Sequence, residues 1–85
     1  MLLNKEELKS KIIYRSSYRG SKEMDILLSS FVKSIINILN DYELKLLDDL
    51  VNLDNENLIK LKNNLKTTIS IKENKITKLF KDFNI

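Results

Sequence analysis

The sequence predicts a small all-α bundle of about five short helices, and three observations point to this fold class. The 85 residues include one glycine and no proline, so few residues suit the tight hairpins of a sheet-rich fold. Several segments open with a helix-capping pattern, and the apolar residues that follow recur at intervals of three and four. We expect residues 1–85 to form a single helical domain, because a chain of this length needs most of its apolar residues for one core.

Three helix starts carry a capping-box pattern, in which a short polar side chain is followed three residues later by Glu. The pairs are Asn4 with Glu7, Asn40 with Glu43, and Ser70 with Glu73. They predict helices that begin near Lys5, Asp41 and Ile71. Hydrophobic staples flank the first two starts, formed by Leu3 with Leu8 and by Leu39 with Leu44.

Apolar periodicity fills in the helices between these starts. Residues 21–39 should form the long central helix, since their apolar stripe is the broadest: Met24, Leu27, Leu28, Phe31, Val32, Ile35, Ile36, Ile38 and Leu39. Residues 54–57 indicate a break and a new helix start, and residues 67–71 have strand-like composition but no partner strand, so we expect a connector. The other inward positions are Leu44, Leu47, Leu50, Val51, Leu58, Leu61, Leu65, Ile76, Leu79, Phe80 and Phe83.

The composition argues against an enzyme. The chain has no Cys, His or Trp, which excludes disulfides, thiol nucleophiles, imidazole acid–base chemistry and the common zinc sites. We therefore predict no catalytic residue and no metal site. Charged residues such as Asp25 and Lys33 interrupt the apolar runs, and the N-terminus lacks the apolar region of a signal peptide. We expect a bacterial cytoplasmic protein that does not insert into a membrane.

The net charge of +3 is unevenly distributed. Residues 1–61 carry nine basic and ten acidic side chains, whereas residues 62–85 carry six lysines and two acids. Binding to a phosphate backbone requires a concentrated basic face, and here only the C-terminal region is basic. We interpret that region as a solvated face rather than a nucleic-acid site.

Residues 14–25 are the most distinctive stretch of the chain. They contain both arginines, Arg15 and Arg19, two of the three tyrosines, Tyr14 and Tyr18, and the single glycine, Gly20. Tyr and Arg are enriched at binding hot spots, and Arg grips carboxylates or phosphates with a planar fork. The spacing of four within each pair predicts two adjacent rows on a helix, followed by a glycine turn.

Two acids follow this turn. Glu23 falls in the first turn of the next helix, close enough to Arg19 to form an ion pair across the loop, and Asp25 lies two residues further on. The two carboxylates point in different directions, so they make a poor acid–base dyad. A purely structural interpretation stands beside the binding one: Gly20 as a C-cap, Glu23 as a helix-start carboxylate and Arg19 as a surface charge. In that interpretation the two tyrosines are amphipathic core residues whose hydroxyls reach water.

These residues resemble the succinate dehydrogenase assembly factor family, the FAD assembly factors of the SdhE and YgfY type. The resemblance runs over residues 11–61 and is carried by Ile12-Ile13-Tyr14, Arg15-Ser16, the R-G-x-x-E motif at Arg19, Gly20 and Glu23, then Asp25, Leu27-Leu28 and Phe31. It departs from the family pattern at Tyr18, where a basic residue is usual, at Lys60, where Trp is common, and at Asn63-Asn64, which replace a Gly.

The resemblance implies a five-helix protein that is not itself an enzyme. Family members bind the flavoprotein subunit of succinate dehydrogenase, and in some bacteria that of fumarate reductase, and promote covalent attachment of FAD to a histidine of that subunit. The resemblance places Arg19, Gly20, Glu23 and Asp25 at the partner contact. Tyr14, Arg15 and Tyr18 join them from the residue pattern. We expect a monomer. The resemblance also implies that FAD belongs to the partner and that this chain binds no cofactor stably itself.

Two other functions stay open from sequence alone. One is a small helical regulator, antitoxin-like or nucleic-acid-binding, for which the Lys-rich C-terminal region is the support. Residues 41–61 argue against a recognition helix there, because they hold six acids against Lys45 and Lys60. The other is a structural bundle that forms oligomers through surplus Leu and Ile.

Overall fold

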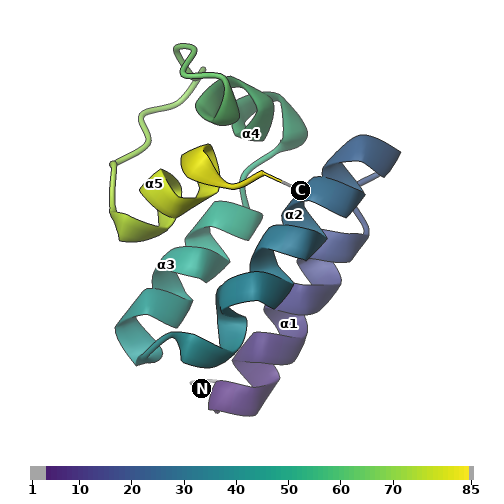
Figure 1. Cartoon of the computed structure of the whole chain (residues 1–85), viewed down its shortest axis with the longest axis vertical. Helices are drawn as coiled ribbons and strands as arrows, with labels where there is room; N and C mark the ends of the chain where they lie inside the picture. Colours follow the sequence, from purple (N-terminus) through teal and green to yellow (C-terminus); the bar gives the residue numbers. More distant parts are fainter. Residues whose placement is uncertain (1–3, 85) are drawn as a thin grey trace.

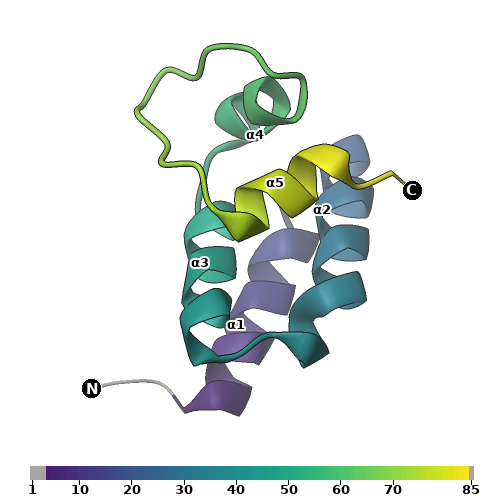
Figure 2. The ribbon, with the colours of Figure 1, turned by 60° about the vertical axis from the view of Figure 1, so that its left-hand side comes forward.

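The computed structural model describes residues 4–84, and within that range the chain is a bundle of helices without strands (Figure 1). The elements are α1 (Lys5–Ser17), α2 (Lys22–Ile35), the 3-10 helix η1 (Ile36–Ile38), α3 (Asp41–Val51), α4 (Asn55–Lys62) and α5 (Lys75–Asp82). Helices α1, α2 and α3 stand side by side, and α4 and α5 lie across one end of them (Figures 1 and 2). The predicted all-α bundle is confirmed.

Local capping determines where α1 and α3 begin, as the sequence predicts. The Asn4 side chain accepts a hydrogen bond from the Glu7 backbone N–H at 2.8 Å. At α3 the capping box is complete, since Asn40 accepts from the Glu43 N–H and Glu43 accepts from the Asn40 N–H. Leu39 and Leu44, the predicted staple, are both buried. The Leu3–Leu8 staple includes a residue outside the described range.

The core is aliphatic, with two phenylalanines at its centre. α2 contributes Met24, Leu28, Phe31 and Val32 and α3 contributes Leu44, Leu47, Leu50 and Val51, all of which are buried as predicted. Phe31 meets Phe80 of α5 edge to face, with ring centroids 5.3 Å apart. These contacts fix α5 over α2 and α3. No helix among residues 4–84 combines the length and the apolar character that crossing a bilayer would require.

The central helix is shorter than predicted. α2 ends at Ile35, and residues 36–38 tighten into η1, where three β-branched isoleucines within four positions weaken the α-helix. In a 3-10 helix residues three apart share a face, so Ile36 and Leu39 are both buried while Ile38 is 79% exposed. The prediction of an inward Ile38 is therefore wrong.

Three predictions in the C-terminal part are also wrong, namely the inward positions of Leu65 and Leu79 and the start of the last helix near Ile71. The α4 helix ends at Lys62 and Asn64 adopts a left-handed conformation with φ 58°, which turns Leu65 outward to 58% exposure. α5 begins at Lys75 rather than Ile71, because Asn74 and Thr77 form the capping box instead of Ser70 and Glu73. The later start points Ile76 and Phe80 into the core and leaves Leu79 partly exposed. Residues 67–71 form a connector, as expected.

Candidate functional site

The α1–α2 junction, residues 18–21, lies at one end of the bundle (Figure 1). The hydroxyls of Ser16 and Ser17 both donate to the Ile13 carbonyl, and such bonds compete with the helix ladder at the end of α1. Ser21 then serves as the N-cap of α2. Between them Gly20 has φ 81°, and a Cβ placed there would meet no atom within 4 Å. The turn therefore needs glycine for its backbone conformation and not for space.

Two tyrosines stand on the outer side of this junction. Tyr14 is 65% exposed and Tyr18 is 72% exposed, and their ring centroids lie 4.8 Å apart with planes tilted by 41°. Tyr18 lies just beyond α1 as its C-cap, yet the predicted tyrosine row is preserved. The pair offers an exposed, preassembled aromatic surface of the type found at protein-binding hot spots.

Both arginine side chains bond to other parts of the bundle. The Arg15 Nη1 atom donates to the Asn52 Oδ1 atom at the end of α3, although Arg15 remains exposed. Arg19 is half-buried, and its guanidinium donates four hydrogen bonds within the chain. The acceptors are the carbonyls of Val51 and Leu53, the Arg15 carbonyl at 3.4 Å and the Asn55 Oδ1 atom at 3.0 Å.

Arg19 is also held through its backbone. Its N–H donates to the Asp25 carboxylate at 2.6 Å, and its carbonyl accepts from the Asn55 Nδ2 atom at 3.0 Å. Burial lowers the pKa of Arg19 from its ordinary value, while the nearby charges of Asp25 and Asp54 raise it. The interpretation of Arg19 as a free surface charge is wrong, since its donors are directed at carbonyls and an amide of other elements.

Glu23 and Asp25 have different surroundings. Asp25 is half-buried against the junction, whereas Glu23 is exposed in the first turn of α2. No hydrogen bond or ion pair to the Glu23 carboxylate is present among residues 4–84, so the predicted pairing with Arg19 is not formed. The physical reason is that the end of α3 presents unpaired carbonyls with partial negative charge, which satisfy the guanidinium first.

A shallow depression adjoins this junction. It has a volume of about 290 Å³, and Glu23 stands on its wall together with Ser21, Met24, Leu27, Ile59, Lys62 and Asn63. Glu23 is thus an exposed carboxylate beside partly apolar surface.

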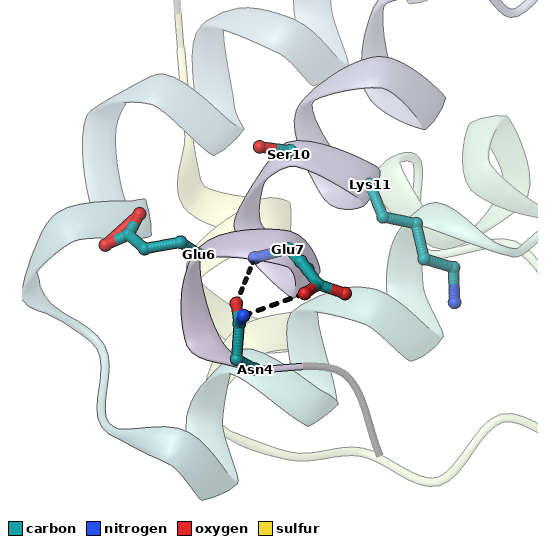
Figure 3. A pocket seen from close by; sticks show the side chains of 5 residues that line it. All are labelled: Asn4, Glu6, Glu7, Ser10 and Lys11. Carbon is teal, nitrogen blue, oxygen red and sulfur yellow. Dashed lines mark hydrogen bonds between the residues drawn. The ribbon is translucent and has the colours of Figure 1, made fainter. Parts of the chain in front are cut away.

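A second hollow lies at the start of α1 and opens broadly to solvent. Figure 3 shows its lining: Asn4 and Glu7 are occupied by the helix cap, and Glu6 and Lys11 point in opposite directions. These side chains do not converge on a common point. Within the described part of the chain there is no group of three or more His, Cys, Asp or Glu residues placed to hold a metal ion.

The C-terminal lysines are partly engaged within the fold. Lys62 donates to the carbonyls of Lys81 and Phe83 at the end of α5, and Lys75 pairs with Glu43 of α3 at 2.7 Å. Lys81 pairs with Glu73 at 3.2 Å. Half of the basic side chains of residues 62–84 therefore bind acceptors of the chain itself, which weakens this region as a phosphate-binding face.

A comparison with known protein families found a match that covers most of the chain. The family model described as the flavinator of succinate dehydrogenase matches residues 10–84. The chain belongs to this family. The match covers the α1–α2 junction and extends beyond residues 11–61 to include α5. Membership in the flavinator family supports a role in the assembly of succinate dehydrogenase. No curated protein and no solved structure matches the chain significantly.

Sequence reasoning missed the residues that hold Arg19. Asn55 was interpreted only as part of a helix start, and the carbonyls of Val51 and Leu53 carry no sequence signal because every residue has one. The usable signal was the choice of Arg where the chain otherwise uses Lys, since only Arg offers five donors in a fixed fork.

Proposed function

We propose that this flavinator-family chain binds the flavoprotein subunit of succinate dehydrogenase and promotes covalent attachment of FAD to a histidine of that subunit. The observation that carries the proposal is the family match over residues 10–84. The chain has no histidine or cysteine of its own, so the residue that becomes linked to flavin is supplied by the partner. We assign the chain no catalytic residue and no resident cofactor.

We propose the α1–α2 junction as the partner contact. Tyr14, Tyr18, Gly20 and Glu23 present exposed aromatic rings, bare backbone and a free carboxylate on neighbouring positions. Arg15, Arg19 and Asp25 belong to the same segment and support it from behind through contacts with α3, α4 and the turn backbone.

The mechanism that we propose is selection of a conformation of the flavoprotein. The junction binds more tightly to the flavoprotein conformation in which histidine and flavin are aligned. Binding therefore raises the population of that conformation, to an extent set by the difference in affinity between the two conformations. The rate gain then comes from proximity and orientation inside the partner. The chain acts as a monomer in the bacterial cytoplasm in this proposal, and fumarate reductase is a second candidate client.

Co-expression with the flavoprotein subunit tests the proposal. Covalent flavin is measured by in-gel fluorescence with the wild-type chain, without it, and with Tyr18→Ala or Glu23→Gln. Tyr42→Ala is the matched control, because Tyr42 is 71% exposed but lies in the first turn of α3 at the opposite end of the bundle (Figure 1). We expect that either junction variant abolishes the fluorescence and that the control keeps the fluorescence of the wild-type chain. Equal fluorescence with and without the chain would refute the proposal.

A duplex-binding titration at two salt concentrations addresses the regulator alternative. Phosphate recognition gives measurable affinity that falls steeply with salt. We expect no such binding, a result supported by the lysines that already pair within the fold.

A further inference from the structure

Arg19 joins the glycine turn to the end of α3. The carbonyls of Val51 and Leu53 lie at the C-terminus of that helix, where backbone acceptors lack intrahelical donors. A guanidinium fits this position for two reasons. Its charge complements the negative end of the helix dipole, and its donors diverge enough to reach several acceptors at once.

Asn55 completes the attachment from α4. Its side-chain oxygen accepts from Arg19 Nε, and its side-chain nitrogen donates to the Arg19 carbonyl, each at 3.0 Å. Together with Asp25 of α2, which accepts from the Arg19 N–H, these bonds engage the backbone and the side chain of one residue. Gly20 follows directly, so its position relative to α2, α3 and α4 is determined by Arg19.

We infer that Arg19 and Asn55 are positioning residues that lock the glycine turn, and that the Arg19 guanidinium does not contact the partner. Their role is to hold Tyr18, Gly20 and Glu23 in the arrangement that docks. The docking half of this inference rests on the proposed function, whereas the locking half concerns the chain alone. The inference separates the R-G-x-x-E motif into an inward part, Arg19, and an outward part, Gly20 and Glu23.

The competing possibility is that Arg19 leaves the bundle on docking and grips an acceptor of the partner. That movement would strip the Val51 and Leu53 carbonyls and the Asn55 side chain of their donor. The two possibilities differ in what Lys can replace. A Lys at position 19 keeps the charge for a partner contact but cannot make the forked contacts to α3 and Asn55.

The first measurement uses the isolated chain. Amide hydrogen exchange is compared for wild type, Arg19→Lys, Asn55→Ala and the control Asn37→Ala, which lies in η1 at the opposite end of the bundle. We expect the Arg19 and Gly20 amides to exchange roughly tenfold faster in the first two variants, since about one net hydrogen bond is lost, with Leu28 unchanged. Unchanged exchange at the turn in Asn55→Ala would overturn the locking role.

The second measurement is the affinity of the same variants, and of Arg19→Lys/Asn55→Ala, for the flavoprotein subunit. Arg19→Lys and Asn55→Ala should each bind roughly tenfold more weakly, and the control Asn37→Ala should bind like the wild-type chain. The double variant should be no weaker than Arg19→Lys, because both changes disrupt the same set of hydrogen bonds. If Asn55→Ala or Arg19→Lys binds the flavoprotein subunit as tightly as the wild-type chain, Arg19 is a direct contact and the inference is overturned. If the wild-type chain fails to bind the flavoprotein, the proposed function is wrong, and so is the claim that the turn docks on this partner. Amide hydrogen exchange of the isolated chain still tests whether Arg19 and Asn55 hold the turn.

Discussion

The two longest connections of the described fold are ordered in different ways. Residues 18–21 join α1 to α2 in four residues. Within them, the single residue Arg19 forms hydrogen bonds with each of the helices α1 to α4 and with the segment after α3. Residues 63–74 join α4 to α5 across twelve residues, and buried Asn57 reaches this connector at one position, Thr68. Figure 2 shows the connector as an extended loop above the bundle.

This difference shows that each connection is ordered by side chains that form hydrogen bonds with another helix. The junction is short and has its own cation as an anchor, so its exposed residues have a defined arrangement. The connector depends on an anchor from α4 and on the cap of α5 at its far end. We therefore expect the connector to open at lower free energy than the junction in hydrogen exchange.

Removing the connector's anchor should have the largest effect on stability. Asn57 is 2% exposed, accepts from the Thr68 N–H at 2.8 Å and donates to Asp54 at 2.7 Å. Asn57→Ala should lower the free energy of unfolding by about 2–3 kcal/mol, because the hydrogen bonds to Asp54 and Thr68 are lost together. Urea denaturation measures this loss, and limited proteolysis should cut within residues 63–74. Asn63→Ala is the exposed control, and equal behaviour of the two variants would contradict the assigned role of Asn57.

Straining the junction should have the next largest effect. Gly20→Val should cost about 1–2 kcal/mol, because a β-branched residue is disfavoured at φ 81°. Since a Cβ meets nothing within 4 Å, the cost comes from the backbone alone, and Gly20→Asn should cost less. Thermal or urea unfolding of both variants measures the order. If Gly20→Asn lost as much unfolding free energy as Gly20→Val, the glycine would be needed for lack of space and not for its backbone conformation.

Truncating the exposed tyrosines should barely change stability. Tyr14→Ala and Tyr18→Ala each remove an exposed ring, so we expect a change of at most about 0.5 kcal/mol in unfolding free energy. The same changes should weaken the flavoprotein complex by about 2 kcal/mol if these residues are hot spots. Denaturation and binding measured on the same samples separate the two effects. A large loss of stability would assign the tyrosines to the fold instead of the docking surface.

The smallest effect concerns the far end of the connector and depends on pH. Hydrogen bonds from Lys75 and from the Asn40 backbone hold the pKa of Glu43 below its ordinary value of 4.5. A lowered folded-state pKa means that this contribution to stability is complete above pH 4.5 and is lost as the pH falls through the folded-state value. The stability gap between wild type and Glu43→Gln should therefore be constant from about pH 5 to 7 and narrow below that range.

Urea midpoints measured at neutral and acidic pH check this prediction. Glu56→Gln is the control, because Glu56 is exposed in the first turn of α4 and has no bond to Lys75. If the stability difference between wild type and Glu43→Gln became larger as the pH falls, the predicted direction of the pH dependence would be wrong. The junction should show no matching dependence from Arg19, whose guanidinium stays charged throughout this range.

Much of the fold was accessible from sequence because its determinants are local. The starts of α1 and α3 depend on side chains three residues apart, and the inward stripes of α2 and α3 depend on helical periodicity. The segment of the candidate site was accessible for a similar reason, since its unusual residues fall within residues 14–25. The tyrosine row at a spacing of four was predicted and is confirmed, whereas the exposure of both rings came from the structure.

Tertiary contacts decided the rest. Two capping patterns compete within residues 70–77, and both satisfy local rules. The pattern that buries Ile76 and places Phe80 against Phe31 prevails, because burial of those side chains outweighs the choice of cap. Leu65 fits the stripe of α4 in sequence but lies beyond the left-handed turn at Asn64.

The sequence by itself therefore determined the helices, most of the core and the segment in which the candidate site lies, since these follow from interactions between residues close along the chain. Only the tertiary structure decided which way the arginine of the R-G-x-x-E motif points. The acceptors at Val51, Leu53 and Asn55 lie more than thirty residues away from Arg19 along the chain, and they converge on it only when α3 and α4 pack against the junction.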